Sequence, residues 1–316
     1  MLNEAQNLAI VRTELDDVFY QEFNYEDSNP VMTTCKNGSI FMQETTDRAF
    51  DIEEVYRGVN LFPIITETQT VPTSTPKVAN KITTQIKDFA QSVELSKDLF
   101  DDNRHGVWAE TVRNLALVAR VSQDQNAFKI FRGAFTTTLT ADGVALCGNH
   151  ALLNGAFYSN NLYDITAATT VLSSTSLNSA IVALAVQPNT NGIILGQQPA
   201  ILLIPPALIK LALELSDSAL AGDVSTNAIN VYRSAYGYRV FSNPYLAASA
   251  GGSDTAWFLL ARNHAIKRFV RQGIETFLRP WGYSNNRTYL YQANFREEVV
   301  AIDYVGVVGA KGTATS

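Results

Sequence analysis

The sequence predicts an α+β protein in which a long helix and strand-rich segments accompany an extended two-stranded hairpin. Residues 96–133 carry apolar side chains at helical spacing, and residues 50–65 and 81–95 are rich in strand formers. Residues 66–76, between those strands, are rich in threonine and contain two prolines, which is typical of a hairpin tip. Because a hairpin of two strands is marginally stable alone, we expect this one to contact another molecule.

The composition is that of a globular protein with a sizeable core. The chain has 316 residues, of which 46% are hydrophobic and 17% charged, so it is long enough for roughly two domains. These proportions argue against intrinsic disorder. The 24 basic and 30 acidic side chains give a formal net charge of −6 and an isoelectric point near 5.2. Such a charge argues against a chain that wraps nucleic acid through a basic face.

Cysteine content and hydropathy indicate where the chain folds. The chain has two cysteines, Cys35 and Cys147, which are far apart in the sequence. One chain therefore cannot build a disulfide framework or a four-thiolate metal site, and folding in a reducing compartment fits best. Residues 1–23 carry acidic side chains where a signal peptide needs positive charge. No later segment offers ~18 uninterrupted apolar residues. We therefore expect no contact with a membrane.

The N-terminal half is predicted to contain a helix, an arm and a long bent strand. Residues 4–23 place apolar side chains at spacings of three and four, which predicts an amphipathic helix. Residues 24–46 are polar and rich in turn formers, which predicts an extended arm that stays out of the core. The alternation of apolar residues changes phase between Ile86 and Phe89, which predicts a bulge or bend.

The long helix and the segments after it complete the expected order of elements. A helical turn is expected at Ser96, and helical spacing then continues from Trp108 to Gly133, about 25 residues or ~40 Å. Further on, Ser174–Ser176 are expected to cap a helix, and Pro205 to start another. Buried or alternating strands are expected at residues 201–204, 231–246, 256–261 and 289–308.

Motifs that would carry chemistry are weak. Cys147 and His150 have the spacing of half a metal site, but the chain contains three histidines in all, and we interpret the segment as a turn. Residues 306–313 resemble a phosphate-binding loop, but Ala310 replaces the glycine before the lysine. We expect no metal, no cofactor and no catalytic residue. The alternative is an enzyme with a dispersed site, for which His150, Asp142 and Arg113 are the candidates.

Several segments, taken in order, resemble those of a known family. They are residues 93–102, 142–146, 159–162, 177–184, 199–208 and 254–260. With the arm, the hairpin and the long helix, they are similar to the major capsid proteins of tailed bacteriophages, which have the Hong Kong 97 or Johnson fold, and among them to Mu-like head subunits. The resemblance implies residues 1–49 as N-terminal helix and N-arm, 50–86 as E-loop, 87–141 as first part of the P-domain with the spine helix, 142–265 as A-domain, and 266–316 as the return strands of the P-domain and the C-terminus.

The same resemblance implies three sets of residues that contact neighbouring subunits. The E-loop set is Arg57, Thr70, Pro72, Pro76, Lys77 and Lys81. The P-domain set is Asp101, Asp102, Arg104, Arg279, Trp281 and Arg287. The A-domain set, in loops near the axis of the capsomer, is Asn189, Asn191 and Gln197. In some members a lysine at the place of Lys77 or Lys81 is crosslinked to a neighbour's asparagine, but we favour a solvated or ion-paired lysine here.

The function that follows is structural. The resemblance implies a non-enzymatic subunit that assembles with itself into pentamers and hexamers and forms an icosahedral shell around double-stranded DNA. It also implies a separate scaffolding protein, a portal and, optionally, decoration proteins, with assembly in the host cytoplasm and residence in the virion capsid. Two alternatives remain open: an encapsulin-like shell around a protein cargo, and the α/β enzyme described above.

Overall fold

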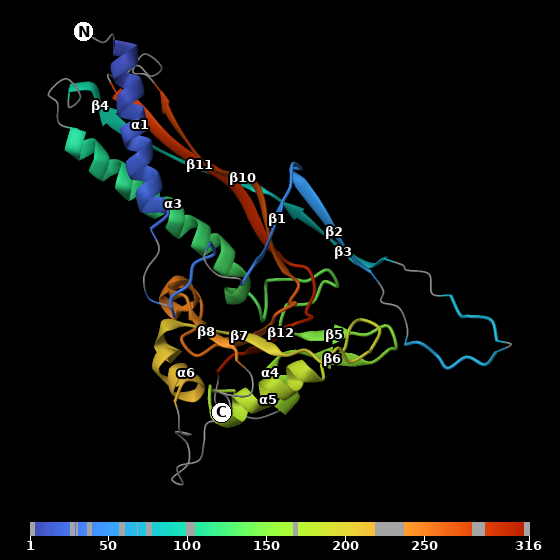
Figure 1. The fold of residues 1–316 in the computed structure, drawn as a ribbon. Coiled ribbons are helices and arrows are strands. Elements are labelled where there is room, and N and C mark those ends of the chain that lie inside the picture. The colour runs from blue at the N-terminus through green and yellow to red at the C-terminus, as the bar shows by residue number, and fades with distance from the viewer. Residues whose placement is uncertain are drawn as a thin grey trace.

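In the computed structural model, two four-stranded sheets are each covered by helices, and a hairpin projects away from both (Figure 1). The structure describes residues 4–25, 29, 31–36, 40–56, 61–67, 69–73, 78–98, 105–166, 170–218, 237–279 and 288–312. Helices and strands both contribute substantially to this range, so the predicted α+β class is confirmed.

The first sheet is long and carries two helices on one face. Its strand order is β1 (Met42–Thr45), β10 (Ile266–Arg279), β11 (Thr288–Ala301) and β4 (Lys87–Ser96), with β1 parallel to β10 and the other pairs antiparallel. Helices α1 (Glu4–Phe23) and α3 (His105–Arg132) pack on it. The core between them includes Phe19, Trp108 and Tyr291, all nearly inaccessible to solvent. The helix predicted at residues 4–23 is confirmed.

The second sheet is buried on both faces. Its order is β12 (Val307–Ala310), β9 (Trp257–Ala261), β7 (Pro199–Ile204) and β8 (Arg239–Ser242). Alternate side chains of β7 and β9 point to opposite faces, so Leu202 and Leu259 contact one cluster while Leu203 and Phe258 contact the other. Helices α4 (Leu162–Thr166), α5 (Ser174–Ala185) and α6 (Ile209–Ser216) contribute to the first of these clusters.

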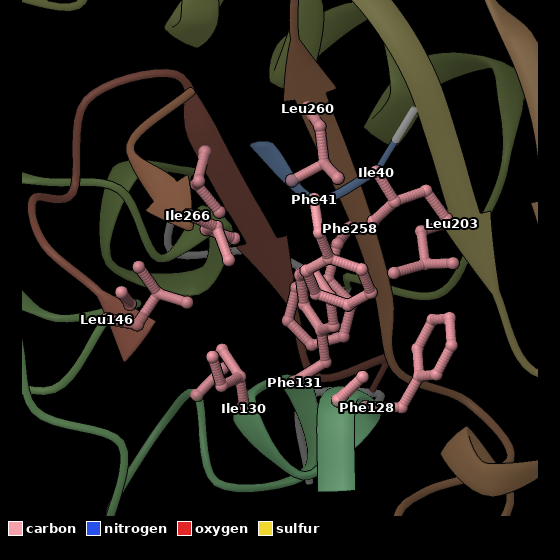
Figure 2. Packing of buried hydrophobic residues seen from close by; sticks show 14 of the residues in the cluster. Ile40, Phe41, Phe128, Ile130, Phe131, Leu146, Leu203, Phe258, Leu260 and Ile266 are labelled. Atoms are coloured by element: carbon pink, nitrogen blue, oxygen red, sulfur yellow. The ribbon is translucent and has the colours of Figure 1, made fainter. Parts of the chain in front are cut away.

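The end of α3 joins the two sheets. Its last turns place Phe128 and Phe131 against the second sheet, with the rings of Phe131 and Phe258 5.1 Å apart (Figure 2). Ile40 and Phe41 pack into the same cluster, and the rings of Phe41 and Phe128 are 5.4 Å apart. One continuous apolar cluster therefore connects the long helix to the second sheet.

Short elements complete the architecture. Strands β5 (Asn149–Ala151) and β6 (Phe157–Ser159) form a small hairpin. Three single turns of 3-10 helix follow the strands of the second sheet: Pro206–Leu208 after β7, and Pro244–Leu246 and Ala248–Ala250 after β8. Helix α5 begins with a capping box in which the Ser173 hydroxyl accepts a hydrogen bond from the Ser176 amide, one residue before the predicted cap.

The projecting hairpin consists of β2 (Phe50–Tyr56) and β3 (Val78–Gln85), paired antiparallel. Ile86 separates β3 from β4, and the two strands belong to different sheets. The bend predicted between Ile86 and Phe89 is thus confirmed at its first residue. Residues 61–65, which the composition placed in a strand, lie outside the paired strands and are exposed to solvent.

Two sequence predictions about the N-terminal half need correction. Residues 24–46 are not excluded from the core, because Cys35, Ile40 and Phe41 are buried and the Cys35 amide donates to the Asp124 carboxylate at 2.8 Å. The long helix does not start at Ser96, because β11 pairs with β4 up to that residue. Lys97 and Asp98 are helical, and the described part of the long helix begins at His105.

Two features of the C-terminal half were not indicated by the local residue pattern. Strand β10 is not among the strands expected from that pattern, and the final strand β12 pairs with β9 in the second sheet. Buried amides hold β12 there: the Asn160 side chain donates to the Val307 carbonyl at 3.0 Å, and the Gln187 side chain accepts from the Gly306 amide at 2.8 Å. These tethers lie far from β12 in the sequence, so local pattern could not indicate them.

A buried histidine between β9 and β10 makes the stability depend on pH. Burial lowers the pKa of His264 to about 4, and its Nδ1 atom accepts a hydrogen bond from the Ile266 amide at 3.3 Å. Unfolded histidine titrates near ~6.5, so between pH 6.5 and 4 the unfolded state binds the extra proton, and stability falls by up to ~3 kcal/mol as the pH decreases. Urea unfolding is expected to show that stability falls less between pH 7 and pH 4.5 in His264→Asn than in the unmodified chain. The asparagine does not titrate, and its side-chain oxygen can still accept the hydrogen bond from the Ile266 amide. Equal losses in both proteins would contradict this assignment.

Candidate subunit contact surfaces

The base of the β2–β3 hairpin is anchored to the first sheet. The Lys267 ammonium on β10 forms ion pairs with Glu53 on β2 at 3.0 Å and with Glu44 on β1 at 2.8 Å. Although burial opposes its charge, the hydrogen bonds that Lys267 donates to these carboxylates raise its pKa. Val55 and Ile82 also pack on a small buried cluster around Phe269. The hairpin therefore has a defined direction relative to the sheet.

The other face of this hairpin is uncovered and exposes several apolar side chains among polar ones. Alternation along β2 places Phe50, Ile52 and Tyr56 on that face, each more than half exposed. Val78 lies opposite Tyr56, and Lys81 lies opposite Glu54, which accepts a hydrogen bond from the Tyr56 hydroxyl at 2.8 Å. A sheet of two strands that exposes these apolar side chains would be stabilised by a further surface that buries them.

The segment that follows β2 is still more exposed. The side chain of Phe62 is 98% exposed and that of Ile64 is 96% exposed, and Val71 farther along is also open to solvent. Exposed apolar groups of this size, grouped on one protruding segment, mark a surface that binds a protein. We call residues 61–65 the apolar loop segment.

The predicted E-loop residues lie on or outside this region. Thr70 and Pro72 are exposed beyond the apolar loop segment, and Lys81 is exposed on the uncovered face. Arg57, Pro76 and Lys77 lie outside the described residues. Their roles in contacts remain predictions. Sequence reasoning missed Phe62 and Ile64, because it took residues 61–65 as part of a strand.

The predicted A-domain residues organise a loop next to the β5–β6 hairpin. The Asn189 side-chain oxygen accepts hydrogen bonds from the backbone amides of Asn191 and Ile193, each at 3.0 Å. This side chain therefore stabilises the backbone of its own loop. Asn191 and Gln197 are half-buried, and the Gln197 Oε1 atom is buried without a hydrogen-bond partner among the described residues. The exposed groups here are apolar neighbours that the sequence reasoning did not select: Leu153, Phe157, Ile194 and Leu195.

The predicted P-domain residues are mostly outside the described range. Arg279 is exposed at the end of β10, where it lies opposite Leu290 on β11. Asp101, Asp102, Arg104, Trp281 and Arg287 are not among the described residues. The role of this set in subunit contacts therefore remains a prediction.

The candidates for catalysis or metal binding do not form a reactive site. His150 is buried, its Nδ1 atom lies 2.7 Å from the Asp142 carboxylate, and its ring stacks on Tyr304. Burial opposes ionisation of Asp142, but hydrogen bonds from His150 and Thr140 outweigh it and lower its pKa. Arg113 is exposed on α3. Cys147 is buried beside β12, and no group of metal-ligating side chains occurs among the described residues.

Comparisons with known proteins agree with this geometry. Residues 79–311, well over half of the chain, match the family model described as phage capsid protein. No match was found among curated proteins. No described helix is both long and apolar enough to cross a membrane.

Solved structures share the fold at low sequence identity. A virus-like particle from Pyrococcus furiosus has a TM-score of 0.53 and 9% identity, covering 94% of this chain and 98% of that one. The procapsid of bacteriophage JBD30 has a TM-score of 0.51 and 11% identity, covering 100% and 77%. The capsid of cyanophage P-SCSP1u has a TM-score of 0.52 and 11% identity, covering 92% of each chain.

The family match bears on all three functions considered from the sequence. The matched family consists of structural proteins, so the enzyme alternative is not supported. The match also favours a phage shell over an encapsulin-like compartment. The order of elements, the projecting hairpin and the long helix on its sheet agree with the predicted fold. The chain belongs to the phage capsid protein family and is a major capsid protein with the Hong Kong 97-type fold, which forms the shell of the particle.

Proposed function

We propose that copies of this chain join into pentamers and hexamers, which close an icosahedral shell around double-stranded DNA. The observation that supports this most strongly is the β2–β3 hairpin, which is anchored at its base by Lys267 and carries nearly fully exposed Phe62 and Ile64 away from the body. In an isolated subunit these exposed apolar side chains bury no surface, so they do not stabilise it. Repeated many times over a closed shell, weak contacts of this kind add up to a stable particle.

The domain layout implied by the sequence resemblance is part of this proposal. We assign the E-loop to residues 50–86, the spine helix to α3, and the region near the capsomer axis to the loop that contains Asn189. The exposed apolar groups beside that loop, Phe157 and Ile194, support a contact between copies there. The uncovered face of β2 and β3 supports a second contact.

The charge of the chain suits a container for DNA. A formal net charge of −6 lets a shell enclose a polyanion without binding it tightly, which packaging and release both require. We further propose that a separate scaffolding protein and a portal take part in assembly in the host cytoplasm, and that decoration proteins are optional partners.

Size-exclusion chromatography with light scattering, followed by negative-stain microscopy of the earliest fraction, tests this function. Rings of five or six subunits, or closed shells that protect DNA from nuclease in particles recovered from infected or co-expressing cells, are the expected results. A stable 34.7 kDa monomer at high concentration would contradict the proposal. Closed particles that contain protein cargo instead of DNA would support the encapsulin-like alternative.

Deleting residues 71–76 is expected to weaken contacts between subunits and leave the subunit folded. The described residues of this stretch, 71–73, are exposed, so the deletion removes no buried side chain from among them. We expect the concentration needed for assembly to rise by about tenfold or more, because each subunit repeats the lost contact. Light scattering over a dilution series measures this change. Particles that form at the original concentration would argue against the assignment of this tip to a subunit contact.

A further inference from the structure

A polar pocket lies where the β2–β3 hairpin, the first sheet and the end of α3 meet. It has a volume of about 450 Å³, which is in the range of pockets that hold small ligands. Its walls include Thr83 and Gln85 on β3, Lys87 on β4, Lys129 on α3 and Glu298 on β11. The pocket therefore includes the last residue of the hairpin and the first residue of the sheet strand that follows it.

The charged groups of this pocket have an excess of positive charge. Among the described residues that line it, Lys87, Lys129 and Glu298 are charged, so two ammonium groups and one carboxylate leave a formal charge of +1. Both lysines pair with Glu298, and the distance from Lys87 is 2.9 Å. Burial and the charge of Lys87 lower the pKa of Lys129, although its bond to Glu298 opposes this. A bound anion would balance the remaining charge.

The two ammonium groups also keep hydrogen-bond donors available. Each group has three N–H donors. Lys129 donates to Glu298 and, at 2.7 Å, to the side-chain oxygen of Asn126, while Lys87 pairs with Glu298. These contacts leave one N–H of Lys129 and two of Lys87 for a ligand. The side chains of Lys87 and Lys129 are 57% and 33% exposed, so a ligand in the pocket can reach both.

The hairpin contributes neutral donors to the same pocket. Thr83 and Gln85 are two residues apart on β3, so their side chains point to the same face of the strand. Both residues are exposed, and both line the pocket. A hydroxyl and a carboxamide each donate hydrogen bonds to anionic oxygens. Cationic donors from the sheet and the long helix thus share one pocket with neutral donors from the hairpin.

We propose that this pocket binds a phosphate group, held by the ammonium groups of Lys87 and Lys129 and by the side chains of Thr83 and Gln85. A phosphate has several acceptor oxygens that point in different directions, so it suits donors from three separate elements, and lysine binds it as a point charge. The phosphate can be a free anion or part of a DNA backbone. Bound there, it links the end of the hairpin to α3 and β4. The site belongs to the single chain and goes beyond the shell function, so either can fail without the other.

Titration calorimetry of the unassembled chain with sodium phosphate tests the site, with the ionic strength held constant by sodium chloride. The unmodified chain is expected to show saturable binding. Lys87→Gln should weaken binding by about tenfold or more, because it removes a charged donor and the excess charge. Lys210→Gln is the matched control, since Lys210 is also an exposed, ion-paired lysine but lies on α6. Absence of saturable binding, or equal affinities in the two variants, would overturn the site.

A second pair of variants tests the part played by the hairpin. Gln85→Leu is expected to weaken phosphate binding by about threefold, the effect of one neutral hydrogen bond. Gln91→Leu is its control, because Gln91 is an exposed glutamine on β4 that does not line the pocket. Hydrogen exchange of the β3 amides should also become slower in saturating phosphate, and not in Lys87→Gln. Unchanged affinity in Gln85→Leu together with unchanged exchange would overturn the link to the hairpin.

Competition with a short DNA duplex distinguishes the two sources of phosphate. Displacement of bound phosphate by the duplex, lost in Lys87→Gln, would identify the DNA backbone as the ligand. Saturable binding of phosphate that the duplex does not displace would identify a free anion. Displacement that is equally strong in Lys87→Gln would contradict recognition of DNA at this pocket.

Discussion

Replacing Phe62 and Ile64 together by serine is expected to abolish shells at concentrations at which the unmodified chain assembles, without unfolding the subunit. Both side chains are almost completely exposed in the single chain, so their loss removes no folding energy. Burying a phenylalanine or an isoleucine at a contact contributes ~1.5–3 kcal/mol each, so the pair contributes ~3–6 kcal/mol per contact. That corresponds to a factor of ~10²–10⁴ in the dissociation constant of each contact.

Two measurements separate an assembly defect from a folding defect. Light scattering over a concentration series gives the assembly threshold, and urea unfolding of the unassembled subunit gives its stability. Val182→Ser is the matched control, because Val182 is an exposed apolar residue on α5, away from the hairpin. An unchanged threshold in the Phe62→Ser, Ile64→Ser variant would show that this segment does not join subunits.

Regular local patterns account for the parts of the fold that could be predicted from the sequence. Residues 4–23 form a helix because their apolar stripe packs on α3 and β11, and the phase change at Ile86 marks the point where the chain leaves one sheet and enters another. The strand at Ile201–Ile204 was recognisable because both of its faces are buried, which requires a continuous apolar run.

Strand β10 could not be delimited from its own residue pattern, because distant residues determine that pattern. Its register against β11 shifts between Val270 and Gln272 and again before Glu275, and each shift breaks the alternation of apolar and polar residues. Arg268, which looks like a surface residue in the sequence, is buried against Glu297. Only the fold brings that carboxylate to the neighbouring strand.

The candidate contact surfaces were predictable only in outline. The Thr/Pro tract identified the hairpin, but the exposure of Phe62 depends on β2 and β3 projecting from the sheet. Asn189, selected as a contact residue, holds its own loop, and its part in a subunit contact stays a prediction. Polarity and turn-forming residues located the loops, while the apolar side chains that the loops expose required the structure.

Arg268→Met is expected to destabilise the subunit by ~3–5 kcal/mol, the cost of leaving a buried carboxylate without its partner. The Arg268 guanidinium donates to the Glu297 carboxylate between β10 and β11, and both side chains are almost inaccessible to solvent. Burial raises the pKa of Glu297 even in the presence of the arginine. The Arg268–Glu297 pair lies next to the point where the register of β10 against β11 shifts. It also interacts with Asp124, which accepts a hydrogen bond from the Cys35 amide and so holds the N-terminal segment.

The pH dependence distinguishes an unpaired charge from a simple loss of packing. Without Arg268 the folded-state pKa of Glu297 rises further above its unfolded value, so the carboxyl contributes stability below the unfolded pKa of ~4.3 and loses it as the pH rises. The penalty of Arg268→Met should therefore be smaller at pH 5 than at pH 7 in urea unfolding. The double variant Arg268→Met, Glu297→Met leaves no buried charge and is expected to be more stable than Arg268→Met alone. A penalty that is independent of pH, or a double variant no more stable than Arg268→Met, would mean that the side chains contribute mainly by packing.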